Sequence, residues 1–132
     1  MLSVDLSIRQ LDDLIVATLC GELDVSDAAS VAAALSAAAG SRAQVVIVDL
    51  AGLAFIDSSG VAALAEAGRQ ARRAGGDLLL AGPQRAVLRV LAITRLSAVL
   101  PLHDDVAAAA SSVGPSRAAR PAPVSLAFVP AT

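Results

Sequence analysis

Residues 45–64, VVIVDLAGLAFIDSSGVAAL, join a run of β-branched residues to a helix-forming segment through an aspartate and two adjacent serines. The run at 44–50 is typical of a strand that is covered on both faces of an α/β sheet. We expect residues 51–57 to connect it to a helix over 58–74, because apolar residues from Val61 onward recur at the spacing of one helix face. The stretch therefore predicts a strand, a turn and a helix in direct succession.

The segment before this stretch predicts a β-hairpin and a further helix. The period-two alternation of a half-buried strand is carried by Val4, Leu6 and Ile8. Residues 14–19 form a more continuous apolar run, and we expect residues 10–13 to make the hairpin connection. Good helix formers fill residues 28–40, where Asp24 or Ser26 is the candidate cap and the final glycine the candidate end.

The second half of the chain continues the alternation of strands and helices. Residues 77–82 predict a buried strand, and residues 83–94 predict a helix with the proline as its first residue. We expect a last short strand at 96–100. Residues 103–113 predict a last helix, capped by one of the two aspartates near its start.

This order of elements predicts one α/β domain over residues 1–113. An initial hairpin followed by alternating strands and helices implies a mixed sheet with helices packed against it and right-handed crossovers. Residues 114–132 contain four prolines and no helical or strand period, so we expect a flexible C-terminal tail.

Composition excludes several classes of function. The chain has 132 residues, a net charge of −2 and no basic cluster that could follow a phosphate backbone, so we expect no nucleic-acid partner. No spacing of His, Cys, Asp and Glu resembles a metal site, and no cofactor is expected. The single cysteine, Cys20, lies in an apolar run and is interpreted as buried filler. With no signal peptide and no long apolar run, we expect a cytoplasmic protein without membrane insertion.

Three roles are open for Ser58 and Ser59. A hydrolase would need a base, and His103 is the single histidine, but the Gly-x-Ser-x-Gly turn of a nucleophile elbow is missing. A structural role needs only Asp57 or a serine as a helix cap. A phosphate acceptor is the third role, because a helix N-terminus tolerates added negative charge. Gly60 in the first turn indicates close approach by a packed neighbour or a partner protein. Physical chemistry alone does not choose between the two serines.

Four segments taken together carry a resemblance to a known family. They are GELDVSDA at 21–28, the stretch 45–64, AGGDLLLAGP at 74–83 and VLRVLAITRLSAVLPLHDDVAAA at 87–109. In this order they resemble the STAS domain of bacterial anti-sigma factor antagonists, over about residues 4–110. Where that family commonly has glycine after threonine, this chain has Arg95, at the end of a predicted helix.

The resemblance implies a phosphorylation switch. In the family, the first serine after the aspartate is phosphorylated, and the matching residue is Ser58. The unphosphorylated antagonist binds an anti-sigma factor that is also a serine kinase, which frees the sigma factor to join RNA polymerase, and a serine phosphatase is an expected further partner. The chain is then a kinase substrate and a binding switch with no catalytic residues. The predicted partner-binding residues are Asp24, Asp57, Ser59, Gly60 and Val61.

Two assignments stay open. Asp24 is a candidate contact of the kinase and equally a helix cap, while Asp57 and Ser59 are expected to set the geometry of the turn. A STAS domain can also serve as a non-switching scaffold or as a subunit associated with a transporter. A serine hydrolase that uses Ser58 or Ser59 with His103 is the alternative from a different class of protein.

Overall fold

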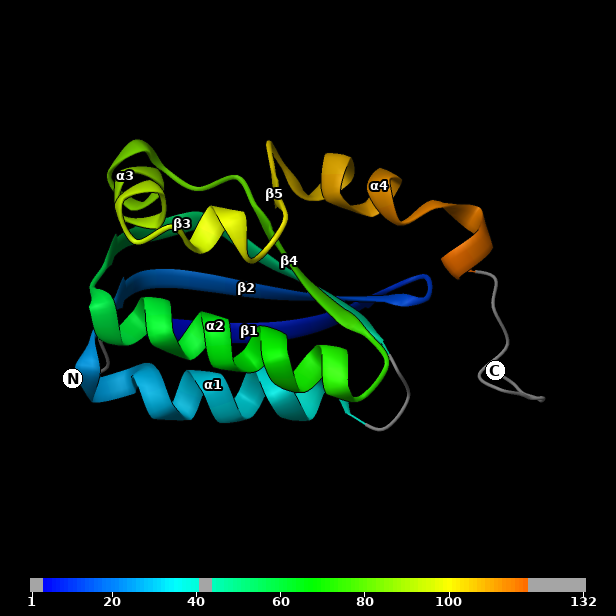
Figure 1. The fold of residues 1–132 in the computed structure, drawn as a ribbon, viewed down its shortest axis with the longest axis horizontal. Helices are drawn as coiled ribbons and strands as arrows, with labels where there is room; N and C mark the ends of the chain where they lie inside the picture. The colour runs from blue at the N-terminus through cyan, green and yellow to red at the C-terminus, as the bar shows by residue number, and fades with distance from the viewer. Residues whose placement is uncertain (1–3, 41–43, 119–132) are drawn as a thin grey trace.

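The computed structural model describes residues 4–40 and 44–118, which form one mixed sheet with helices on both faces (Figure 1). The strands lie in the order β1-β2-β3-β4-β5. In chain order the elements are β1 (Val4–Leu11), β2 (Leu14–Leu23), α1 (Val25–Ala39), β3 (Val45–Ile56), α2 (Ser58–Arg73), β4 (Asp77–Ala81), α3 (Arg85–Ile93), the 3-10 helix η1 (Leu96–Ala98), β5 (Leu102–His103) and α4 (Val106–Ala118). The predicted α/β class, the hairpin and the alternation that follows it are confirmed.

The sheet begins with a tight antiparallel hairpin and continues with parallel strands. Leu11 of β1 pairs with Leu14 of β2, so only Asp12 and Asp13 make the turn. Asp12 has φ 54°, in the left-handed region that aspartate tolerates better than most residues. The remaining neighbours, from β2 to β5, all run parallel. Their carboxyl ends therefore share one edge of the sheet, where α1 and α2 begin.

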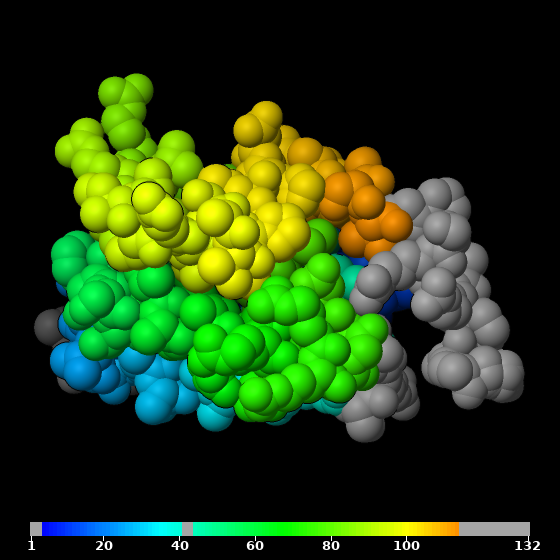
Figure 2. All heavy atoms as spheres, in the orientation of Figure 1, coloured from blue at the N-terminus to red at the C-terminus, as the bar shows by residue number. Residues whose placement is uncertain are grey.

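The two faces of the sheet are covered unequally. One face packs against α1, α2, α3 and η1 and holds the larger core, with Leu35 of α1, Leu64 of α2 and Leu91 of α3 fully buried. Figure 2 shows this helical layer from outside, from α1 (blue) through α2 (green) to α3 and η1 (yellow). The other face is packed against α4, which buries a smaller cluster around Val16 and Ile47. The main hydrophobic core therefore lies between the sheet and the layer of α1, α2, α3 and η1.

Strand β3 is longer than the sequence predicted. The segment 51–57, expected to be a connector, is strand up to Ile56. It stays paired with β2 through two irregularities in register, and the pairing ends with Leu23 beside Ile56. An extra residue lets a strand bend while it remains paired. The two strands consequently end side by side, and Asp24 and Asp57 follow them directly.

Two predictions for the second half of the chain are corrected. Helix α3 begins at Arg85 after Gln84, so Pro83 precedes the helix and is not its first residue. The segment 96–100, predicted as a strand, contains the 3-10 helix η1, and the strand that pairs with β4 is Leu102–His103. Alternation of apolar residues does not distinguish a short strand from a 3-10 turn. The pairing of Leu80 with Leu102 shows which residues form the last strand.

The last helix continues past the predicted domain boundary. Asp105 caps α4 by accepting a hydrogen bond from the Ala108 N–H at 2.7 Å, which agrees with one of the two predicted caps. The helix runs to Ala118, five residues beyond the predicted end of the domain at residue 113. The boundary at residue 113 remains a prediction, and residues 119–132 of the predicted tail lie outside the described residues.

Two side chains lie on the surface against expectation. Cys20, predicted as buried filler, is exposed because it points to the face packed by α4, and α4 reaches β2 only at Leu14 and Val16. Its sulfur lies over Gly52, where a Cβ atom would be 2.6 Å from the Sγ atom. Ile8 of β1 is 46% exposed. It faces the helical layer, but β1 is an edge strand and the core ends before it.

Candidate functional site

Two helix starts lie side by side at one edge of the sheet. The backbone N–H of Asp57 donates to the carbonyl oxygen of Leu23 at 3.2 Å, which ties the start of α2 to the end of β2. Asp24 caps α1 by accepting from the Ser26 N–H at 2.9 Å. Asp57 caps α2 by accepting from the Gly60 N–H at 3.0 Å. Each carboxylate thus satisfies one of the free donors of a helix N-terminus and favours its partial positive charge.

The two serines of the α2 turn differ in accessibility. Ser58 is the first residue of α2 and is exposed, whereas Ser59 is half-buried. Successive helical residues point about 100° apart, so the turn can present only one of the two hydroxyls fully to solvent. The oxygen that an incoming enzyme or partner can reach most easily is therefore that of Ser58.

Gly60 is crowded by the domain itself. A Cβ atom there would lie 2.7 Å from Cγ1 of Ile56, 2.9 Å from Cγ of Leu23 and 3.0 Å from the Leu23 carbonyl oxygen. Such distances are too short for any real side chain, and one of the three neighbours is backbone. Of the two explanations open from the sequence, a packed neighbour accounts for this glycine. The first turn of α2 is consequently fixed against the ends of β2 and β3.

The predicted partner-binding residues divide into a surface group and a buried group. Asp24, Asp57 and Ser59 are half-buried, and each exposes part of its side chain. Gly60 is buried, and Val61 is only 9% exposed and belongs to the core. The structure therefore places Asp24 at the start of α1 and the other four residues in the first turn of α2, with Gly60 and Val61 beneath the surface.

Two exposed apolar side chains near this turn escaped the sequence analysis. Val25, the first residue of α1, is 73% exposed, and Phe55, near the end of β3, is 47% exposed. The Cα atoms of Phe55 and Ser58 are at most about 11 Å apart, since a fully extended chain spans no more than about 3.6 Å per residue. The exposure of Phe55 follows from the bent end of β3, where Leu53 and Ile56 both point inward. Strict alternation would not have placed it outside.

His103 does not lie beside either serine of the turn. It pairs with Ala81 of β4, which pairs with Asp49 of β3, and β3 continues for seven residues from Asp49 to Ile56. At about 3.3 Å per residue, this part of the strand spans roughly 23 Å. The Nε2 atom of His103 instead lies 3.4 Å from the Ser112 hydroxyl of α4. The geometry gives no support to the hydrolase alternative.

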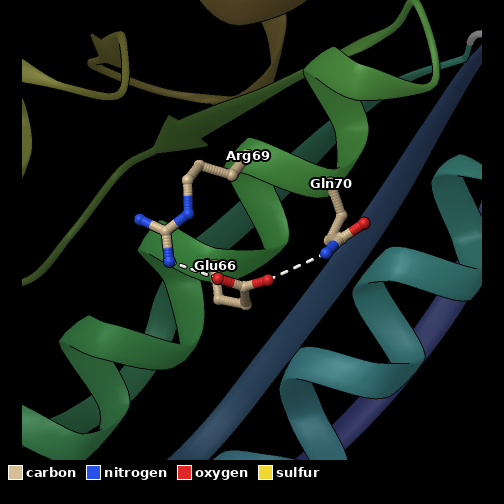
Figure 3. Close-up of polar contacts among 3 residues, drawn as sticks. All are labelled: Glu66, Arg69 and Gln70. Atoms are coloured by element: carbon tan, nitrogen blue, oxygen red, sulfur yellow. Dashed lines mark hydrogen bonds and ion pairs between the residues drawn. The ribbon is translucent and has the colours of Figure 1, made fainter.

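The outward face of α2 carries a small polar network (Figure 3). The Glu66 carboxylate accepts a hydrogen bond from Gln70 at 2.9 Å and another from the guanidinium of Arg69. The hydrogen bond from Gln70, and then the bond and positive charge of Arg69, lower the pKa of Glu66 below its usual value. These residues are two or more helical turns after Ser58, so they belong to the solvated face of the helix and not to the turn.

The described residues contain neither a candidate metal site nor a candidate membrane-spanning helix. Over residues 4–40 and 44–118, the acidic, cysteine and histidine side chains form no group of three or more that could hold a metal ion. Over the same ranges, no helix has both the length and the apolar character needed to cross a bilayer.

Several solved structures share this fold. An anti-sigma factor antagonist from Mycobacterium paratuberculosis superposes with a TM-score of 0.75 at 22% identity, covering 84% of this chain and 94% of that chain. SpoIIAA, an anti-sigma factor antagonist, is similar in its unphosphorylated form with a TM-score of 0.70 at 24% identity, covering 83% and 96%. Its phosphorylated form from Bacillus has a TM-score of 0.63 at 23% identity, covering 83% and 99%.

Part of a much longer protein also has this fold, and a match to a family model identifies the family of this chain. Murine Slc26a9, an anion transporter, has a TM-score of 0.66 at 16% identity, covering 77% of this chain and 18% of that chain. No match to a curated protein was found. Residues 5–109 match the STAS domain family. Since this match spans most of the chain, the protein belongs to the STAS domain family.

Proposed function

We propose that this protein is a cytoplasmic anti-sigma factor antagonist whose binding is controlled by phosphorylation of Ser58. In its unphosphorylated form it binds an anti-sigma factor that is also a serine kinase, and the bound sigma factor is released. Phosphorylation of Ser58 ends that binding, and a serine phosphatase restores it. The observation that carries the proposal is the exposed Ser58 hydroxyl at the first position of a helix whose turn is fixed by Gly60.

The surroundings of Ser58 fit a surface that another protein covers. Val25 at the start of α1 and Phe55 near the end of β3 offer exposed apolar area, and aromatic anchors often dominate the energy of an interface. A neutral hydroxyl in such an interface can be buried at small cost if it keeps a hydrogen bond. Because the turn is already packed, the partner would meet a preformed surface and lose little free energy to ordering.

A phosphate on Ser58 would change binding far more than folding. It adds about 1.5 to 2 negative charges, beside the capping carboxylate of Asp57 and near Asp24. The free N–H groups and the dipole of α2 favour an anion at this end, so the fold tolerates it. A partner that closes over the turn must strip water from the phosphate beside two carboxylates, and an uncompensated buried charge in an interface costs about 2–5 kcal/mol.

The decisive experiment compares two serines at the two helix starts. Ser58→Asp should weaken binding to the cognate anti-sigma kinase by about thirtyfold to a few thousandfold, since about 1.4 kcal/mol corresponds to a factor of ten. Ser26→Asp places the same charge in the first turn of α1, where Ser26 is also exposed, and should weaken binding much less. Ser58→Ala should bind like the wild type. Isothermal titration calorimetry measures all three affinities.

The modification itself is tested by mass spectrometry after incubation with ATP and the cognate kinase. We expect one phosphate, on Ser58, and none on Ser58→Ala. Ser59→Ala should still be modified, because it keeps the exposed acceptor Ser58 and loses only the half-buried serine. Modification of Ser59 in the wild type would contradict the assignment. Equal affinity of the kinase for the phosphorylated and unphosphorylated chain would contradict the switch.

A non-switching STAS subunit is the second candidate, and the likeness to part of murine Slc26a9 favours it. A domain in that role would keep its partner whether or not Ser58 is phosphorylated. The same calorimetric series separates the two candidates, because only the switch predicts a large difference between Ser58→Asp and Ser26→Asp.

A further inference from the structure

The outer edge of β1 is unpaired within residues 4–40 and 44–118. Strand β1 has eight residues and is the terminal strand of the sheet on its side, whereas β5 at the other side has only two (Figure 1). An edge strand presents a row of backbone N–H and C=O groups that can pair with another strand. Of the residues from Asp5 to Leu11, all except Leu6 and Leu11 are exposed. The edge is therefore long enough and open enough to add a strand.

The side chains of β1 divide between the two faces of the sheet. On the helical face Val4 is buried, Leu6 packs against the core and Ile8 is 46% exposed. On the other face Asp5, Ser7 and Arg9 are all exposed. No side-chain hydrogen bond or ion pair joins Asp5 or Arg9 to another residue of the described chain. Two opposite charges on the same face thus remain available to a partner.

We propose that a second copy of this chain pairs with β1 in antiparallel orientation about a two-fold axis at Ser7. This inference goes beyond the proposed function and does not depend on it. In this register Asp5 of each copy lies opposite Arg9 of the other, so two ion pairs flank the central pair of Ser7 residues. Side chains directly opposite each other have Cβ atoms about 4.5–5.5 Å apart, within reach of an aspartate and an arginine.

The apolar face is complementary in the same register. Ile8 of each copy lies opposite Leu6 of the other, so the exposed side of Ile8 would be covered by a residue that already borders the core. The same two-fold rotation therefore pairs the charged side chains on one face of β1 and the apolar side chains on its other face. A C2 interface needs such self-complementarity, since the same patch meets itself.

Other pairings of the strand with itself are less favourable. A parallel pair in register would bring Asp5 beside Asp5 and Arg9 beside Arg9, and like charges opposite each other destabilise a sheet. An antiparallel pair shifted by two residues would place Arg9 opposite Ser7 and leave the charges without partners. A shift by one residue would put polar side chains on the helical face. The charge pattern thus selects one register out of those available.

Charge exchange on the full-length chain tests the interface. Sedimentation equilibrium should show a reversible dimer of the wild type, and Asp5→Arg and Arg9→Asp alone should each weaken it at least tenfold, because each creates two like-charge pairs. The double variant Asp5→Arg/Arg9→Asp restores opposite charges and should dimerise like the wild type. Mixing the two single variants should produce a heterodimer, since one chain then has arginine at both positions and the other has aspartate.

Asp13→Arg is the matched control for the two charge variants. It makes the same change of charge as Asp5→Arg, but in the hairpin turn outside the paired register, and it should leave the dimer intact. A wild type that stays monomeric up to about 1 mM would overturn the proposal. Single variants that dimerise as well as the wild type, or a mixture that forms no heterodimer, would also overturn it and would place any self-association on another surface. A chain that dimerises only after removal of residues 119–132 would likewise overturn the proposal for the full-length protein.

Discussion

The starts of α1 and α2 use the same local device in different tertiary surroundings. Both helices follow neighbouring parallel strands, and both have an aspartate cap that accepts one backbone hydrogen bond. At α1 the next residue, Val25, is 73% exposed, whereas the turn of α2 places Gly60 against Leu23 and Ile56. The caps are local features of the sequence, but the α2 turn is in addition packed closely against Leu23 and Ile56 at Gly60. The difference explains how a serine can be exposed on a turn whose next residues are packed against the core.

Gly60→Ala tests the tertiary part of this contrast and should have the largest effect on stability. The new methyl group would meet the Leu23 carbonyl oxygen and two core side chains. Overpacking typically costs about 1–3 kcal/mol, and alanine returns up to about 1 kcal/mol as a better helix former. We expect a net loss of about 1–2 kcal/mol in the free energy of unfolding, measured by urea denaturation.

Gly68→Ala is the matched control for that measurement. Its methyl group would meet the Cδ2 atom of Leu100 at 2.5 Å, and the other close atoms belong to the same leucine side chain. A flexible side chain can shift where a carbonyl oxygen cannot, so this variant should lose less stability than Gly60→Ala. Equal losses at the two positions would show that the α2 turn is not held more firmly than the rest of the helix.

Removal of the two caps tests the local part of the contrast. Asp57→Ala and Asp24→Ala each lose one capping hydrogen bond, which usually costs about 0.5–2 kcal/mol. We expect about 1 kcal/mol for Asp57→Ala and a smaller value for Asp24→Ala, because the bond of Asp57 is partly buried and that of Asp24 is exposed. Thermal unfolding of both variants gives the comparison, and a larger loss for Asp24→Ala would reverse it.

Arg95→Gly tests a helix end where a local backbone preference is violated. Arg95 has φ 63°, and the left-handed region costs a residue with a Cβ atom about 1–2 kcal/mol. Glycine removes that cost but loses about 0.5–1 kcal/mol of conformational entropy on folding. We expect a net stabilisation of about 0.5 kcal/mol by chemical denaturation. Asp12→Gly, at φ 54°, is the control and should gain less, because aspartate tolerates this conformation.

The Glu66 network should have the smallest effect, because it lies on the solvated face of α2. The pKa of Glu66 is lowered by Gln70 and Arg69 from its usual value of 4.5. The charged form of Glu66 therefore stabilises the folded state at a pH above that usual value. That contribution is lost as the pH falls through the lowered pKa. The difference in unfolding free energy between the wild type and Glu66→Gln should therefore disappear in acid. A difference that grows as the pH falls would contradict this sign.

Much of the fold was predictable because its signals are local. The β-branched run that became β3, the end of α2 near Ala74 and the aspartate caps all follow from properties of neighbouring residues. The errors have a common cause as well. The end of β3, the 3-10 helix at Leu96 and the exposure of Cys20 depend on which strand or helix lies alongside, and no short window of sequence contains that information.

The candidate site divides in the same way. Its aspartates, serines and glycine were identified from the sequence, and a cap at Asp57 was expected. The burial of Val61 agrees with the apolar stripe that the sequence predicted for this helix. The exposure of Ser58 relative to Ser59 and the exposed Phe55 required the packed structure, because they depend on how the turn and the bent end of β3 lie against the core.

By itself, the sequence determined the order of strands and helices, the residues that cap them and the turn at which a serine lies. Only the tertiary structure decided that β2 and β3 end side by side, that Gly60 fills the space left by Leu23 and Ile56, and that no other described strand covers the outer edge of β1. The reason is that hydrogen bonds within a turn join residues close in the chain, whereas packing joins residues that the chain brings together only when it folds.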